Sequence, residues 1–341
     1  MNMEKKLNVL EAVRGGAALY VFLVHFMFMY FIDRTSLFSI LFSFGQEAVI
    51  LFFLMSGFVI QYSYIKNKSN FKTYFKKRFF RIYPLFLIAI LMVVINNIIE
   101  GIKIDYKTLF GNLLMLQDAA FFLKPGIIVD TFENSALWSL SYEWWFYMLF
   151  IPVSSFKNKN QVATLIIVIS TILYFIYPIQ LFRWLTYFSI WWSGVILADL
   201  YVLNQLNLKN ILKKIVLSVL LFPTLSVIFK SFQEPFVSIG FYPIIEVRHF
   251  FSAIFFIMLA FIWRKKKWMG YNFFKPLESI APFSYGIYVL HIPIITIFGS
   301  IVINHIKYIL IQFTLITLIV LLIAYFFEIK IQKKIINYFS R

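Results

Sequence analysis

The segment Val13–Ile32, VRGGAALYVFLVHFMFMYFI, decides the fold class, because it is long and apolar enough to cross a lipid bilayer. A helix of about 20 apolar residues spans a hydrocarbon core of about 30 Å. Two ionisable residues, Arg14 and His25, stand within it, and such residues face a protein interior or a water-filled cavity. On a helix they point in nearly the same direction and lie about 16 Å apart. The segment therefore predicts one wall of a polar pathway. A stop-transfer arginine and a buried structural histidine would give the same pattern.

The whole chain has the same apolar character. Of its 341 residues, 61% are hydrophobic and 14% are charged, against about 45–50% and 25% in soluble domains. The apolar residues form long runs instead of alternating, which predicts an all-α, polytopic membrane protein that forms a single domain over residues 1–341, without a fused soluble domain. About ten transmembrane helices are expected, near 12–32, 43–64, 79–99, 137–155, 162–178, 184–203, 212–230, 247–263, 282–303 and 308–328.

Positive charge lies in the short connections between these runs. The net charge is +17, and alternate connections, beginning with 66–81, are rich in Lys and Arg while the intervening ones are poor in them. This is the pattern of the positive-inside rule. It predicts a multi-pass protein of the inner (plasma) membrane with both termini cytoplasmic. Because this pattern accounts for the basic residues, we do not expect a nucleic-acid partner. The expected partner of the chain is the lipid bilayer.

The chain has no cysteine and four scattered histidines, so we expect neither disulfides nor a metal site built from thiolates or several histidines. The segment Tyr106–Leu123 is apolar only in patches and carries Asn112, Gln117 and Asp118. We interpret it as an interfacial or re-entrant element on the outer side.

His25 and Glu143 are candidates for acid–base chemistry. His25 lies about seven residues from the outer end of its span and Glu143 about six residues into the span 137–155, so both have a similar depth. A carboxylate can fix the tautomer of a histidine and stabilise the imidazolium. The two residues could equally form a buried structural ion pair.

Arg14, Arg78 and Arg81 form a candidate anion site. Arg78 and Arg81 are three residues apart, so they share a helix face at the inner end of their span, and Arg14 stands at the same level. Guanidinium groups bind phosphate oxygens bidentately, which suits a polyphosphate. Ordinary determinants of membrane topology would have the same sequence spacing.

Other polar residues stand inside apolar spans. Glu47 is shallow on the outer side and could meet a polar substrate, and Trp138 could stack on a sugar ring or belong to an aromatic belt. Ser139 and the indole N–H of Trp138 are candidate donors to an oxyanion. We expect His291, two residues before Pro293, to be structural.

Five motifs in chain order resemble acyltransferase family 3, bacterial membrane enzymes that O-acylate sugars and other hydroxyl acceptors. They are EAVRGGAALYVFLVHF with Arg14 and His25, GQEAVILFFLMSGFVI with Ser56 and Gly57, KRFFRIYP with Arg78 and Arg81, LWSLSYEWWFY with Trp138, Ser139 and Glu143, and SYGIYVLHIPII with Ser284, Tyr285 and His291. The chain departs from the commonest pattern at Glu11, where the family has aspartate, and in having no outer esterase-like domain.

The resemblance implies acyl transfer from acyl-CoA, with acetyl-CoA as the expected donor, to a hydroxyl of a cell-surface glycan or lipid-linked sugar. Arg14, Arg78 and Arg81 would then bind the donor's phosphates, His25 would act as general base oriented by Glu143, and Glu47, Trp138 and Ser139 would contact the acceptor. A covalent acyl-histidine route remains open.

Two other functions are compatible with a polar pathway in a membrane protein. A transporter or flippase of a lipid-linked saccharide would move its substrate without consuming a thioester. A structural partner of a polysaccharide assembly complex would tolerate the loss of Arg14, His25 and Glu143 together. The ordered Arg and His motifs favour the transferase.

Overall fold

The computed structural model describes residues 3–33, 37–119, 129–235, 240–306 and 308–339, and within these ranges the chain is helical without a β-strand, as predicted. Nine helices of the described residues are long and apolar enough to cross a membrane. They are α1 (Met3–Tyr30), α2 (Gly45–Lys66), α3 (Phe71–Ile99), α6 (Lys159–Ile176), α7 (Gln180–Val202), the continuous α8 (Leu208–Ile211), η3 (Leu212–Leu220) and α9 (Leu221–Gln233), then α10 (Ile244–Lys265), α12 (Ser284–His305), and the continuous α13 (Ile309–Tyr325), η6 (Phe326–Gln332) and α14 (Lys333–Phe339).

The fourth predicted span, 137–155, is not among these nine, because its helix is shorter. It forms α5 (Trp138–Ser154), a helix of 17 residues that follows the single turn η2 (Ser135–Leu137). At 1.5 Å per residue α5 is about 25 Å long, slightly less than the hydrocarbon core of a bilayer. Its first five residues are buried, so the helix begins inside the protein.

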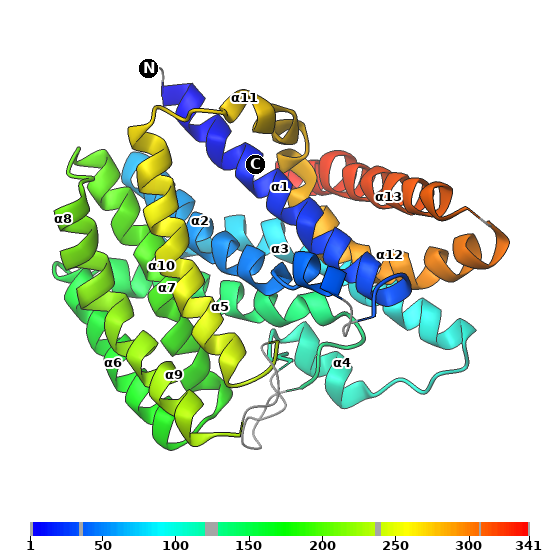
Figure 1. Cartoon of the computed structure of the whole chain (residues 1–341), viewed down its shortest axis with the longest axis horizontal. Coiled ribbons are helices and arrows are strands. Elements are labelled where there is room, and N and C mark those ends of the chain that lie inside the picture. The colour runs from blue at the N-terminus through cyan, green and yellow to red at the C-terminus, as the bar shows by residue number, and fades with distance from the viewer. Residues whose placement is uncertain (1–2, 34–36, 120–128, 236–239, 307, 340–341) are drawn as a thin grey trace.

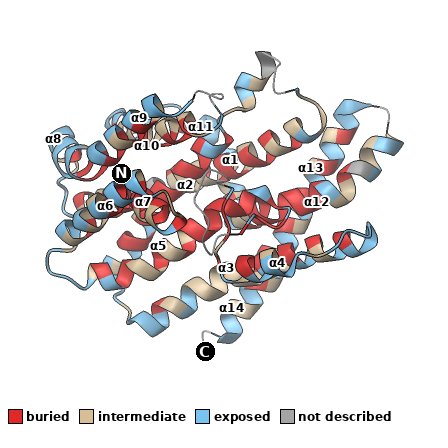
Figure 2. Ribbon diagram, turned by 90° about the horizontal axis from the view of Figure 1, so that it is seen from below, coloured by how far each residue is buried: buried red, intermediate tan, exposed pale blue. Residues whose placement is uncertain are grey.

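The helices form one bundle, with α1, α2, α3 and α12 between a group made of α6, α7, α9 and α10 at one end and α13 at the other (Figure 1). Burial follows this arrangement, because buried residues concentrate on the central helices (Figure 2). In the most apolar stretch of each helix, 72% of residues are buried in α7 and 65% in α12, against 28% in α6 and 22% in the α13 span. The last two therefore offer most of their surface to lipid.

Two glycines bring α2 and α7 into backbone contact. A Cβ atom on Gly57 would lie 2.0 Å from the carbonyl oxygen of Trp191, and one on Gly194 would lie 2.1 Å from that of Leu54. Small residues at such crossings are typical of membrane helices, where close van der Waals packing drives association. This crossing fixes α2, and with it the SGF motif, against the aromatic core of α7.

Helices α1 and α12 run in the same direction with a defined register. The guanidinium of Arg14 donates to the carbonyl oxygen of Ala281, 2.9 Å away in the short turn η5 (Ala281–Phe283) that leads into α12. Further along, the hydroxyl of Tyr30 donates to the carbonyl oxygen of Ile295 at 3.1 Å. Because both helices rise about 1.5 Å per residue, residues equally far from the first contact meet side by side.

The predicted outer element near residues 106–123 is partly described. It begins with α4 (Tyr106–Leu113), capped by Asp105, and continues through the buried residues Met115, Gln117 and Asp118. Gln117 forms a single bridge with Val129 and its amide donates to the carbonyl oxygen of Leu137. The segment thus enters the protein interior and covers the start of α5, while residues 120–123 of the predicted element lie outside the described ranges.

Candidate active site

A cavity of about 160 Å³ lies among α1, α2, α3, α5 and α12. It brings together the three predicted arginines, Arg14, Arg78 and Arg81, with Ser139 and Glu143 from α5. The remaining polar groups of its wall are hydroxyls, contributed by Ser56, Tyr147, Ser284, Tyr285 and Tyr288. Side chains from five segments far apart in the sequence therefore converge on one space.

The three arginines differ in how they are held. Arg81 is fixed by the buried carboxylate of Glu328 at 2.5 Å, and Arg14 pairs with the half-exposed Glu11 at 2.6 Å. The guanidinium of Arg78 lies over the rings of Tyr74 and Tyr147, at 5.6 and 5.5 Å from their centres. Among the described residues no carboxylate lies within ion-pair distance of Arg78.

Two donors in this cavity are buried and unsatisfied. The Nε atoms of Arg14 and Arg78 have no acceptor among the described residues. A buried donor without a partner costs about 1–3 kcal/mol, more when it is charged. An anion bound between these arginines would remove that cost, so the cavity suits a negatively charged ligand.

Glu143 lines this cavity. The sequence predicted that it pairs with His25, but its hydrogen-bond partners are other residues. Its Oε1 accepts hydrogen bonds from Ser56 Oγ at 2.9 Å and from the hydroxyl of Tyr147, and Trp191 Nε1 donates to Ser56 Oγ at 3.1 Å. The predicted pairing is wrong because α5 begins beneath the segment that contains Gln117 instead of at the outer surface. Counting residues from the outer end of the span therefore misjudged the depth of Glu143.

His25 meets His291 instead. His291 Nε2 lies 3.2 Å from His25 Nδ1, and the ring centres are 5.0 Å apart. The prediction that His291 is only structural overlooked this contact. The sequence could not reveal this contact, because it depends on the register of α1 and α12, which the hydrogen bond from Arg14 to Ala281 sets.

The tautomers of His25 and His291 follow from the backbone carbonyl groups next to their rings. His25 Nδ1 lies 2.9 Å from the carbonyl oxygen of Val21, and His291 Nδ1 lies 2.9 Å from that of Ile287. Carbonyls only accept, so each Nδ1 of the neutral rings carries the proton and His291 Nε2 faces His25 Nδ1 as an acceptor. The lone pair of neutral His25 is then on Nε2, the atom able to take a proton.

Tyr288 borders both the cavity and the histidine pair. It lines the cavity, and its ring centre lies 6.3 Å from that of His291. Its hydroxyl donates to the carbonyl oxygen of Ala136 and accepts from Ser139 Oγ, both at 2.6 Å. Ser139, a predicted acceptor contact, thus holds Tyr288 at the end of the cavity that is nearest to the histidines.

The other two predicted acceptor contacts lie elsewhere. Glu47 is buried and pairs with Arg248 at 2.5 Å. Trp138 is buried with its ring stacked on His249, at 6.1 Å between centres and 6° between planes. Neither residue lines the arginine cavity.

A second charged cluster was missed in the sequence. Arg183 is buried in α7, where its Nη1 donates to Asp118 at 2.8 Å and its Nε to Glu246 at 2.7 Å. The hydroxyl of Tyr142 also donates to Asp118, at 2.8 Å. In the sequence these residues appear only as isolated charges next to apolar spans, which can indicate a buried polar site. That they contact one another follows only from the packing of α5, α7 and α10.

Comparison with known proteins agrees with the resemblance of the motifs. A family model described as an acyltransferase domain matches residues 7–329. Acyltransferase MdmB of Streptomyces mycarofaciens is 36% identical over 155 residues, which cover 42% of this chain and 38% of that relative. The chain thus matches less than two thirds of the relative's length, and no solved structure matches it. Because the family model spans nearly the entire helical bundle, with both the arginine cavity and the histidine pair, this chain belongs to acyltransferase family 3, and the nine apolar helices of its described residues make it a multi-pass membrane protein.

Proposed function

We propose that this protein transfers an acetyl group from acetyl-CoA to a hydroxyl of a cell-surface glycan or of a lipid-linked sugar. The observation that carries the proposal is the arginine cavity, which has two unsatisfied buried arginine donors and ends at Tyr288, next to the histidine pair. Family membership supports the acyl transfer itself. The donor, the acceptor and the residue roles are parts of the proposal.

The donor's phosphates bind Arg14, Arg78 and Arg81. Fixed guanidinium groups favour phosphate oxygens through paired, charge-assisted hydrogen bonds. Arg78 makes the main new contact, because Arg14 and Arg81 are already paired with Glu11 and Glu328. Since these arginines follow the positive-inside pattern of the loops, the donor enters from the cytoplasm and both termini are cytoplasmic, as in a protein of the plasma (inner) membrane.

The thioester travels from the arginines toward His25 past Tyr288. Arg14 and His25 are separated by about 16 Å along α1, which the extended pantetheine arm covers. Tyr288 and Ser139 line the cavity, and Tyr288 also borders His291, so the arm passes these two side chains on its way to His25. Hydrogen bonds from the hydroxyls of Ser56 and Tyr147 hold the Glu143 carboxylate in place beside this path.

His25 is the general base. Its Nε2 takes the proton of the acceptor hydroxyl as the oxygen attacks the thioester carbonyl, the carbon–sulfur bond breaks, and the imidazolium returns the proton to the departing thiolate. The reaction releases CoA and an O-acetylated acceptor. His291 supports the base by accepting from His25 Nδ1–H, which keeps the reactive lone pair on Nε2. No metal takes part in this scheme, and the described residues contain no group of ligands suited to a metal ion.

The test is acetyl-CoA consumption by the purified, membrane-reconstituted protein with surface glycan as acceptor. The chain has no cysteine, so a thiol reagent reports only released CoA. We expect His25→Ala to lower the rate by about 10²–10⁴-fold, as for the loss of a general base. His305→Ala is the matched control, because His305 is exposed and bonded to the carbonyl oxygen of Ile301 in its own helix.

Mass spectrometry of surface glycans identifies the product. Cells with the intact gene should carry an acetyl mass increment that is absent from cells with His25→Ala and present in cells with His305→Ala. If His25→Ala inserts into the membrane and keeps full activity, His25 is not the general base. If the protein consumes acetyl-CoA but surface glycans are identical with and without the gene, a surface glycan is not the acceptor.

A further inference from the structure

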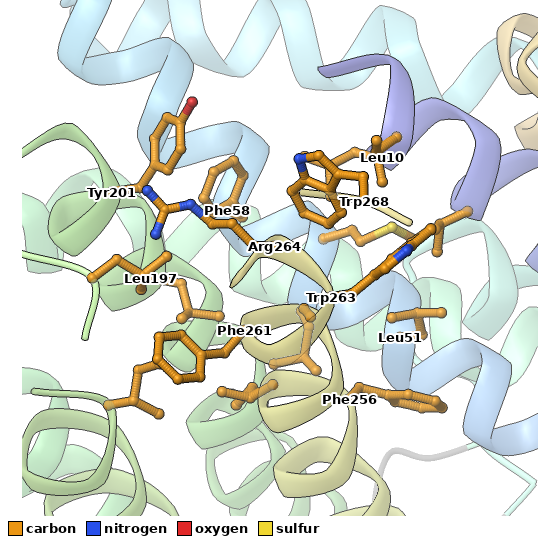
Figure 3. A pocket seen from close by; sticks show the side chains of 18 residues that line it. Leu10, Leu51, Phe58, Leu197, Tyr201, Phe256, Phe261, Trp263, Arg264 and Trp268 are labelled. Atoms are coloured by element: carbon orange, nitrogen blue, oxygen red, sulfur yellow. The ribbon is translucent and has the colours of Figure 1, made fainter. Parts of the chain in front are cut away.

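A second cavity of about 160 Å³ lies between α1, α2, α7 and α10, separate from the arginine cavity except for a shared wall residue, Met55. Its lining is almost entirely apolar, with Leu51 and Phe256 at one end (Figure 3). Toward the other end lie the polar atoms of Arg264, Trp268 and Tyr201 (Figure 3). The cavity therefore has a cationic end and an apolar end.

Arg264 lacks an acidic partner at this position. It stands in the last turn of α10 with its guanidinium over the ring of Tyr201, at 5.7 Å from the centre. Among the described residues no carboxylate lies within ion-pair distance of it. The exposed residues Lys265, Lys266 and Lys267 follow directly, so the positive charge of this end is uncompensated locally.

Trp268 adds a second group that lacks a partner. Its indole Nε1 is buried and has no acceptor among the described residues, whereas Trp263 Nε1 in the same wall donates to the carbonyl oxygen of Met269 at 2.8 Å. Since a buried donor seldom stays unpaired, the cationic end of the cavity suits a ligand with acceptor oxygens. A guanidinium and an indole N–H together suit the oxygens of a phosphate.

The length of this cavity and its position on a membrane-spanning helix favour a lipid over a small, water-soluble anion. Arg264 and Phe256 are eight residues apart on α10, so the cavity wall extends about 12 Å along this helix from Arg264 to Phe256. Ala260, which lines the cavity midway, is exposed, so the cavity is reached from the surface of a membrane-spanning helix. A phosphate headgroup at the end of the helix with an acyl chain beside it meets all these features.

We propose that this cavity binds an anionic phospholipid, with the phosphate on Arg264 and Trp268 and one acyl chain between α2 and α10. The charge of the basic end complements an anionic headgroup, as in other basic pockets at membrane surfaces. The acyl donor of the transfer reaction is a poorer occupant, because its phosphates have a cavity with three arginines on the other side of Met55.

The experiment measures lipid binding to the full-length protein in detergent by native mass spectrometry. Phosphatidylglycerol and phosphatidylcholine with identical acyl chains are compared. We expect phosphatidylglycerol to bind more tightly, and Arg264→Gln to weaken its binding about fivefold or more, the effect of one basic residue near an anionic headgroup. Lys266→Gln, an exposed neighbour with the same charge loss, should leave the affinity within about twofold.

Two further measurements separate the parts of the site. Ala260→Trp should fill the apolar part and weaken phosphatidylglycerol binding while thermal unfolding of the protein is unchanged. Inorganic phosphate and acetyl-CoA, each at millimolar concentration, should not displace the lipid. The proposal is overturned if the two lipids bind equally, if Arg264→Gln and Lys266→Gln behave alike, or if acetyl-CoA displaces the lipid.

Discussion

His291 Nε2 lies 3.2 Å from His25 Nδ1 and joins two helices whose contact residues are 266 positions apart in the chain. The hydrogen bond from Arg14 to the carbonyl oxygen of Ala281 sets the register that makes this contact possible. Arg14 thus has two roles. Its guanidinium lines the arginine cavity, and its hydrogen bond to Ala281 fixes α12, the helix that carries His291.

We expect His291→Ala to slow acetyl transfer by about 10–100-fold, the usual loss when a supporting partner of a functional histidine is removed. His25 Nδ1–H would keep the carbonyl oxygen of Val21 as an acceptor but lose His291 Nε2, so the imidazolium formed during transfer would be less stabilised. The measurement is the pH profile of kcat. Its acidic limb should move in His291→Ala, and His291→Gln, whose amide oxygen can accept, should restore part of the rate. An unchanged pH profile in His291→Ala would assign His291 to structure alone.

Arg78→Met should raise the KM for acetyl-CoA by about 10–100-fold with little change in kcat, because a hydrogen bond to a charged group contributes about 1.5–3 kcal/mol. Methionine removes the guanidinium that lies over the rings of Tyr74 and Tyr147 and keeps a long, apolar side chain at this position. Steady-state kinetics with varied acetyl-CoA provide the test. Lys77→Met is the control, since Lys77 is exposed one residue away. Equal KM values for both variants would exclude Arg78 from donor binding.

Arg183→Met should destabilise the protein by about 3–5 kcal/mol, the typical cost of leaving buried charges unpaired. Asp118 and Glu246 would both lose the guanidinium that neutralises them and keep only neutral donors, such as the hydroxyls of Tyr142 and Tyr174. Thermal unfolding in detergent measures the effect. Lys159→Met is the comparison, because the Lys159–Asp199 pair is partly exposed, at 22% and 19%, and should contribute about 1 kcal/mol or less. Similar unfolding temperatures for the two variants would show that the Arg183 cluster is not required for stability.

Gly57→Ala should lower stability by about 1–3 kcal/mol, since the new methyl group would overlap backbone that cannot move aside easily. The added Cβ would lie 2.0 Å from the carbonyl oxygen of Trp191. The yield of folded protein and its unfolding temperature are the readouts. At Gly240 an added Cβ meets no atom of the described residues within 4 Å, so Gly240→Ala should behave like the wild type. If Gly57→Ala unfolds at the wild-type temperature, the α2–α7 crossing is looser than its geometry implies.

The fold class followed from local properties of the sequence. Runs such as Val13–Ile32 can only be helical in lipid, because each backbone polar group must then be paired within the segment. The prediction of an all-α membrane protein is confirmed. The length of α5 was harder to anticipate, because the buried segment around Gln117 covers its first turns and the helix can therefore be shorter than the bilayer core.

For the site, residue types and chain order identified the acyltransferase family, and the structure brings Arg14, Arg78 and Arg81 into one cavity together with Glu143 and Ser139. Their functional roles stay predictions. The pairing of Glu143 with His25 failed, since a depth counted along one helix says nothing about where a neighbouring helix begins.

The sequence by itself determined that the chain crosses a membrane as a helical bundle, because hydrophobic length and periodicity act within each segment. It also determined the family, because the motifs are short and contiguous. The tertiary structure decided which side chains meet: His25 with His291, Glu143 with Ser56, and Arg183 with Asp118. Those pairs depend on helix register and on close crossings such as that of α2 with α7, which arise from packing between segments distant in the chain.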